Sequence, residues 1–195
     1  MALLNWHGFR TAAWGGMGLL AAALLLVVGQ GKCVQAATLG GFLGVALLFV
    51  RRERQLPTLF DVIFVGAALI NAVGWAWNLF DQPGLYDEVA HAFTMFAITL
   101  ALGFLLYNEL MHGFYAHWVM FVVTIASMGI AIGALWEVVE WLADFVIPMQ
   151  IVAGLSDTVT DLILDSAGAV LAAMLNLWGL NERARQERST ASAHE

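Results

Sequence analysis

The segment that decides the fold runs from Trp118 to Val146 and reads WVMFVVTIASMGIAIGALWEVVEWLADFV. No charged side chain occurs in it before Glu137. A helix of roughly 20 apolar residues crosses a bilayer core about 30 Å thick. The segment therefore predicts a transmembrane helix, and Glu137 and Glu140 near its end predict acidic groups within the membrane.

The composition of the whole chain agrees with this segment. Of its 195 residues, 61% are hydrophobic and 12% are charged, and the mean hydropathy is +0.80. Soluble domains carry about twice that charged fraction, near 25%. A single cysteine excludes a disulfide framework, and 8 basic against 15 acidic residues exclude a nucleic-acid-binding surface. The chain is predicted to be an integral membrane protein whose first partner is the lipid bilayer.

Six segments have the length and apolar character of membrane spans, and short breaks with turn or charged residues separate them. The first also resembles a signal peptide, but it exceeds the usual apolar core of about 7–15 residues, which favours an uncleaved span. We predict an all-α polytopic membrane bundle with one domain at residues 1–180 and a solvated, loosely ordered cytoplasmic tail at 181–195. The predicted spans are residues 11–29, 34–50, 58–80, 88–107, 118–146 and 158–180.

The basic residues set the orientation of these spans. With six spans and a cytoplasmic N-terminus, seven of the eight lie inside, and Lys32 alone lies outside. Because Lys and Arg concentrate in cytoplasmic loops, both termini are predicted to be cytoplasmic.

The acidic residues, in contrast to the basic ones, are concentrated on the predicted outer side. Nine of the fifteen fall in outer loops or in the outer parts of the last three spans, where Lys32 is the sole basic residue. Salt bridges within the chain therefore cannot neutralise them. These nine residues are Asp81, Asp87, Glu88, Glu137, Glu140, Asp144, Asp157, Asp161 and Asp165.

The spacing of these acids places several of them on shared helix faces. Asp87 and His91 are four residues apart, which is about one helical turn. Glu137 and Glu140 fall on one stripe of the fifth span. The sixth span carries acids at four-residue steps on one face, at Asp157, Asp161 and Asp165.

Ionised acids inside the membrane need compensation. Each costs roughly 2.5–3.5 kcal/mol near the centre of a span, so four of them cost on the order of 10 kcal/mol. A bound cation, shared protons or a water-filled cavity could compensate for this cost. Carboxylates with an imidazole favour zinc, manganese or iron over magnesium or calcium. We predict a divalent metal site formed by Asp87, His91, Glu137, Glu140 and Asp161, with Asp157 and Asp165 as outer or supporting ligands.

Several nearby residues have structural alternatives. Asp157 enters a helix, where an aspartate caps free N–H groups, so capping and ligation remain equally open. Asn71 and Asn78 either hydrogen-bond into the site or join helices. The tryptophans near the outer surface are expected to form an interfacial belt and to pack the helices, with stacking on a ligand as the alternative, at Trp75, Trp77, Trp136 and Trp141. Small-residue steps predict close helix packing at Gly40/Gly44 and at Gly129/Gly133.

The sequence around these acids resembles the YjdF-like family of bacterial inner-membrane proteins. The resemblance rests on DEVAHAF at 87–93, ALWEVVEW at 134–141 and DTVTD at 157–161, followed by Gly168-Ala169. It implies a multi-pass helical protein of the bacterial inner membrane and no particular activity. The family positions that it carries over are Asp87, His91, Glu137, Glu140, Asp157 and Asp161, and neither Glu88 nor Asp165 is among them.

Three functions follow from these patterns. The first is a metal-dependent membrane hydrolase, in which Glu137 or Glu140 is the general base and the substrate is lipid-linked or periplasmic. The second is a proton- or cation-coupled transporter that uses the same acids. The third is a structural subunit whose acids meet a basic partner. The first two spans hold no acid and are expected to serve as a scaffold or as the surface of a homo-oligomer.

Overall fold

The computed structural model describes residues 7–52, 57–80, 82, 84–110, 117–147 and 151–192. All six helices in these ranges are long and apolar enough to cross a membrane. The predicted all-α bundle of six spans is therefore confirmed. The helices are α1 (His7–Gly29), α2 (Cys33–Arg52), α3 (Thr58–Trp77), α4 (Tyr86–Leu110), α5 (Trp118–Ala143) and α6 (Leu155–Ser192).

Two helix ends differ from the sequence prediction. Helix α3 stops at Trp77 because Asn78 adopts the left-handed conformation, with φ 52° and ψ 45°, and its N–H bonds the Gly74 carbonyl. Helix α6 continues to Ser192, twelve residues beyond the predicted end of the sixth span at residue 180. Residues 181–192 read NERARQERSTAS, which contains good helix formers and neither Gly nor Pro.

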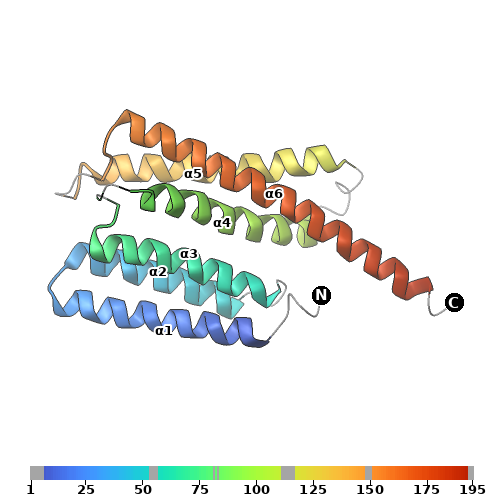
Figure 1. Ribbon diagram of the computed structural model, residues 1–195, viewed down its shortest axis with the longest axis horizontal. Helices are drawn as coiled ribbons and strands as arrows, with labels where there is room; N and C mark the ends of the chain where they lie inside the picture. The colour runs from blue at the N-terminus through green and yellow to red at the C-terminus, as the bar shows by residue number, and fades with distance from the viewer. Residues whose placement is uncertain are drawn as a thin grey trace.

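The six helices form two groups of three (Figure 1). Helices α1–α3 form one group and α4–α6 the other, and the packing of α3 on α4 joins them. Helix α1 begins and α6 ends at the same end of the molecule. The opposite end holds the α1–α2 turn, the start of α4 and the connection from α5 to α6. The acidic segments thus lie at the end away from the termini.

An arginine fastens the first group at the end of the termini. Arg10 Nη2 donates a hydrogen bond of 2.7 Å to the Val50 carbonyl, and its Nη1 lies 3.9 Å from Asp61 Oδ2. Asp61 is buried. One side chain of α1 therefore contacts both α2 and α3.

The second group packs closely through glycines. A Cβ at Gly168 would overlap the backbone of Ala92, and one at Gly129 would lie 2.7 Å from the Ala169 Cβ. The predicted packing step at Gly129/Gly133 is confirmed. The step at Gly40/Gly44 is wrong, because a Cβ at either position would meet nothing within 4 Å.

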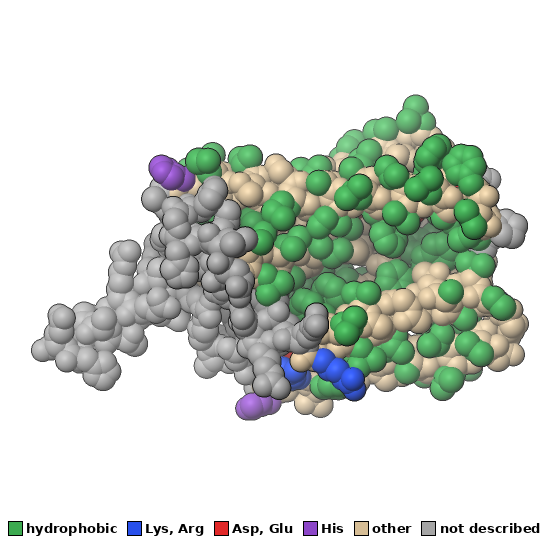
Figure 2. Space-filling model, turned by 180° about the vertical axis from the view of Figure 1, so that it is seen from behind, with side chains coloured by type: hydrophobic (Ala, Val, Ile, Leu, Met, Phe, Trp, Pro, Cys, Tyr) green, Lys and Arg blue, Asp and Glu red, His purple; other side chains and the backbone are tan. Residues whose placement is uncertain are grey.

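Hydrophobic side chains cover the long flanks of the molecule (Figure 2). Large apolar side chains are more than half exposed on α1, α2, α5 and α6, as an outer surface in contact with lipid chains requires. Examples are Leu25, Leu48, Leu135 and Trp178.

We predict that Gly129→Ala lowers the thermal unfolding temperature in detergent by several degrees. The added methyl group overpacks the contact with Thr99 and Ala169, which costs about 1–3 kcal/mol. Gly44→Ala is the matched control, because space is open there, and it should leave the unfolding temperature nearly unchanged. Equal effects of the two substitutions would contradict the packing described here.

The orientation can be tested with the single cysteine. Cys33 is exposed at the α1–α2 turn. If the arginine-rich end is cytoplasmic, a membrane-impermeant maleimide labels Cys33 in cells with a permeable outer envelope and an intact inner membrane. The control Cys33→Ser/His117→Cys places the thiol at the opposite end and should label only after lysis. The reverse pattern would invert the orientation.

Candidate functional site

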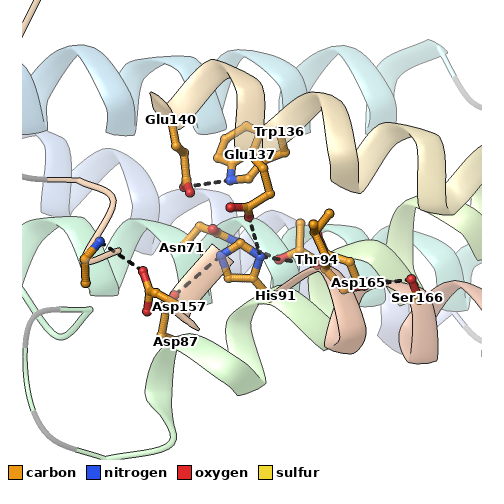
Figure 3. Close-up of polar contacts among 12 residues, drawn as sticks. Asn71, Asp87, His91, Thr94, Trp136, Glu137, Glu140, Asp157, Asp165 and Ser166 are labelled. Carbon is orange, nitrogen blue, oxygen red and sulfur yellow. Dashed lines mark hydrogen bonds and ion pairs between the residues drawn. The ribbon is translucent and has the colours of Figure 1, made fainter. Parts of the chain in front are cut away.

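One histidine meets carboxylates from three helices (Figure 3). His91 lies on α4 and is 8% exposed. Its Nδ1 is 3.2 Å from Asp165 Oδ1 on α6 and 3.8 Å from Glu137 Oε1 on α5. Its Nε2 is 3.5 Å from Asp87 Oδ1, one turn earlier on α4. The predicted convergence of acids from the last three spans is therefore seen in the structure.

Asp165 fixes the orientation of this imidazole. It is fully buried, and it fits between α5 and α6 because Gly133 has no side chain. When Nδ1 donates its proton to Asp165, the other nitrogen, Nε2, carries the lone pair. The lone pair then faces the side of the ring on which Asp87 lies.

Two groups of side chains in this region could hold a metal ion. Asp87, His91 and Asp161 offer ligand atoms within 4.8 Å of one another, and so do His91, Glu137 and Glu140. These five residues are the predicted ligands. Asp157 and Asp165, which were predicted as outer or supporting ligands, belong to neither group.

The two glutamates of α5 differ in their surroundings. Glu140 Oε1 accepts a hydrogen bond of 2.8 Å from Trp136 Nε1. Glu137 is 7% exposed, and its buried Oε1 accepts no hydrogen bond from the described residues. Glu137 thus lies beside His91 without a full set of partners, whereas Trp136 fixes the position of Glu140.

The site borders a cavity of about 520 Å³. Its polar wall includes Asp87, His91, Glu140, Asp157 and Asp161, and its apolar wall includes Trp75, Phe80, Met95 and Trp136. The volume is in the range of pockets that hold small molecules. Among the described residues that line it there is no Lys or Arg.

The tryptophans divide into two kinds. Trp75 and Trp136 line the cavity, so the prediction of an interfacial belt does not describe them. Trp77 and Trp141 are more than half exposed near the same end, as that belt requires.

Two aspartates hold the connection between α5 and α6 over the cavity. Asp144 accepts backbone N–H bonds from Ile151, at 2.6 Å, and from Val152, at 3.2 Å. Asp157, in the first turn of α6, accepts the N–H of Ala153 at 3.1 Å through Oδ2, and this bond goes to the connection before the helix rather than to a free N–H group of α6. Asp157 still lines the cavity. Of the other two predicted outer acids, Glu88 lies in the first turn of α4, and Asp81 lies outside the described residues.

The two asparagines, at the edge of the cavity, stabilise the packing and the end of α3. Asn71 Nδ2 donates to Thr94 Oγ1 at 2.7 Å and to the Ala67 carbonyl at 3.0 Å, which joins α3 to α4. Asn78 caps α3. Sequence reasoning missed Thr94 and Met95, although both lie about one turn after His91, and only the position of α3 shows that they face a cavity.

The chain matches a family of membrane proteins over most of its length. The family described as "Predicted membrane protein (DUF2238)" matches residues 12–182. The chain belongs to this family. The DUF2238 match includes all the acids around His91 and agrees with the multi-pass membrane fold. No curated protein and no solved structure matches the chain.

We predict that Asp144→Ala loosens the connection over the cavity. The substitution removes two hydrogen bonds to a carboxylate, each worth about 1.5–3 kcal/mol. Amide hydrogen exchange at Ile151 and Val152 should rise by at least about tenfold. Thr160→Val is the control, because Thr160 bonds only the Ser156 carbonyl of its own helix. Unchanged exchange in Asp144→Ala would show that other contacts hold the connection.

Proposed function

We propose that this DUF2238 protein binds one divalent transition-metal ion through Asp87, His91 Nε2 and Asp161. The observation that carries the proposal is the buried contact of Asp165 with His91 Nδ1, which leaves Nε2 facing the carboxylates. A carboxylate behind a ligating histidine is a recurrent arrangement in metal sites, where it fixes the ring and raises its basicity.

The donor set supports a particular class of metal. One imidazole with two carboxylates suits zinc, manganese or iron, whereas magnesium and calcium favour oxygen ligands alone. Three protein ligands leave a coordination position open, which is typical of catalytic rather than structural sites. The cation would also offset the negative charge of acids that have no basic neighbour in the cavity wall.

The reaction that this arrangement supports best is hydrolysis. A metal ion at such a site supplies a Lewis acid and activates water. Glu140 lines the cavity, held by Trp136, and serves as the general base. It takes the proton of a water molecule whose oxygen bonds to the ester carbon or phosphorus, and the leaving oxygen receives that proton as its bond breaks. Glu137, beside His91, is the second candidate base.

The location follows from the charges at the two ends. The arginines of the described helices lie at the end of the termini, which supports a cytoplasmic position for that end and a periplasmic opening of the site. The resemblance to bacterial inner-membrane proteins supports the same proposal, that the protein belongs to a bacterial inner membrane. Its substrate is lipid-linked or periplasmic.

A coupled carrier is less well supported, because a carrier needs a path to both faces. The inner half of α6 packs with no exposed surface at Ala169, Ala172 and Ala173. That packing supports a cavity that opens on one side. The buried polar groups near it are Thr99 and Asn176, and Asn176 donates a hydrogen bond of 3.3 Å to the Thr99 carbonyl.

Metal analysis of the detergent-purified protein tests the proposal. We expect one equivalent of zinc, manganese or iron in the wild type, and a loss of that metal in His91→Ala and in Asp161→Asn. His117→Ala and Asp144→Asn are the matched controls, since neither residue belongs to the proposed ligand set, and both should keep it. A metal-free wild type that binds none of these ions on titration would overturn the proposal, and proton-dependent flux in liposomes would then favour the carrier.

The proposed role of Asp165, which is to orient His91 as a metal ligand, can be tested separately. Asp165→Asn removes the charge behind His91 with little change of volume, and it should weaken metal affinity by about 10–100-fold without abolishing binding. Competition with a chelator of known affinity measures this change. Affinity equal to that of the wild type would show that Asp165 only packs between the helices.

A further inference from the structure

The cavity lies where the two groups of helices separate. One wall comes from α3, through Gly74 and Trp75, and the facing wall includes Trp136 of α5. Both helices pack on α4, but within the described ranges α3 and α5 make no close backbone contact with each other. The cavity therefore lies in a gap between two membrane spans.

The flank of the molecule is also hollowed where these helix groups separate. Seen from behind, the molecule is hollowed between the two groups of helices, and hydrophobic side chains border the hollow (Figure 2). Met95, at the inner part of the cavity, lies nine residues after Tyr86, where α4 begins. At 1.5 Å per residue this is roughly 13 Å along the helix. The cavity thus reaches toward the middle of a bilayer core about 30 Å thick.

The lining has a polar part and an apolar part. The carboxylates and His91 stand on α4, α5 and α6, whereas Trp75, near the end of α3, together with Met95 and Trp136 offers an apolar surface. A ligand that matches both parts has a polar group at one end and a hydrocarbon chain at the other. Because the described lining of the cavity contains no Lys or Arg, the polar group of the ligand meets no basic side chain there and must instead offer oxygen atoms to the proposed cation.

We propose that the substrate is an ester- or phosphoester-linked membrane lipid that enters sideways between α3 and α5. Its chain lies along Trp75, Met95 and Trp136, and its ester group lies beside His91 and Asp161. This inference rests on the proposed function for the reaction, whereas entry of the lipid rests on the gap and the lining alone. The lipid fills a space that would otherwise expose apolar walls to water, so burial of its chain favours binding.

Photolabelling tests lipid entry directly. The full chain is reconstituted in phosphatidylcholine bilayers with trace phosphatidylcholine that carries a diazirine in its acyl chain, and labelled residues are mapped by mass spectrometry. We expect label on Trp75, Met95 or Trp136, and on the lipid-facing Trp178, but none on the fully buried Ile125. Label on Trp178 with none on the cavity residues would overturn the proposal.

A variant that fills the cavity gives a second test. Met95→Trp should reduce labelling of Trp136 by about tenfold, if the larger side chain costs the bound lipid roughly 1.4 kcal/mol, and should leave labelling of Trp178 unchanged. The wild-type map remains decisive if this variant does not fold. Crosslinks between two copies of the chain across the gap would overturn lipid entry in favour of a dimer interface.

Two further readouts separate the possible failures. In Cys33→Ser/Met95→Cys, modification by a water-soluble maleimide without lipid labelling would show an aqueous cavity and overturn lipid entry. His91→Ala separates entry from chemistry, because lipid labelling should persist when the metal is lost. A wild type that holds metal but takes no lipid label would leave the metal site standing and remove this inference.

Discussion

The arrangement of the second helix group depends on one buried contact, between His91 and Asp165. Neither residue could occupy its position alone at low cost, because an unpaired polar group inside a membrane bundle loses its hydration without replacement. The contact needs α4 and α6 close together and α5 close to both. The glycines supply this closeness, since Gly133 makes room for Asp165 and Gly168 lies against the α4 backbone. The packing of the glycines and the contact between His91 and Asp165 therefore require the same close spacing of α4, α5 and α6.

The sequence predicted the fold well because membrane insertion is governed by the apolar length of each segment. The six spans and the end at which the acids gather follow from such lengths and from the distribution of charges. Helix ends were less predictable. The left-handed turn at Asn78 and the continuation of α6 past residue 181 depend on local backbone conformation, which hydropathy does not report.

The residues that form the site could be predicted from the sequence, but the role of each residue could not. Helical spacing brought Asp87 and His91 onto one face and Glu137 and Glu140 onto another. Spacing does not show, however, which acid contacts Nδ1 of the imidazole and which acids lie on the side of Nε2. That division depends on how α6 turns against α4, and it separates Asp165 from Asp161 although they are one turn apart. Likewise, only the placement of α3 brings Trp75 and Trp136 to the same cavity.

The junction between the two groups of helices has a mechanical consequence. All the candidate ligands of the metal stand on α4, α5 and α6, whereas α3 supplies only one wall of the cavity. Because the groups meet chiefly along the α3–α4 pair, a small rotation about that pair changes the width of the lateral opening and leaves the coordination geometry untouched. The width of that opening and the spacing of the candidate ligands are therefore set by different helices, the first by α3 and the second by α4, α5 and α6.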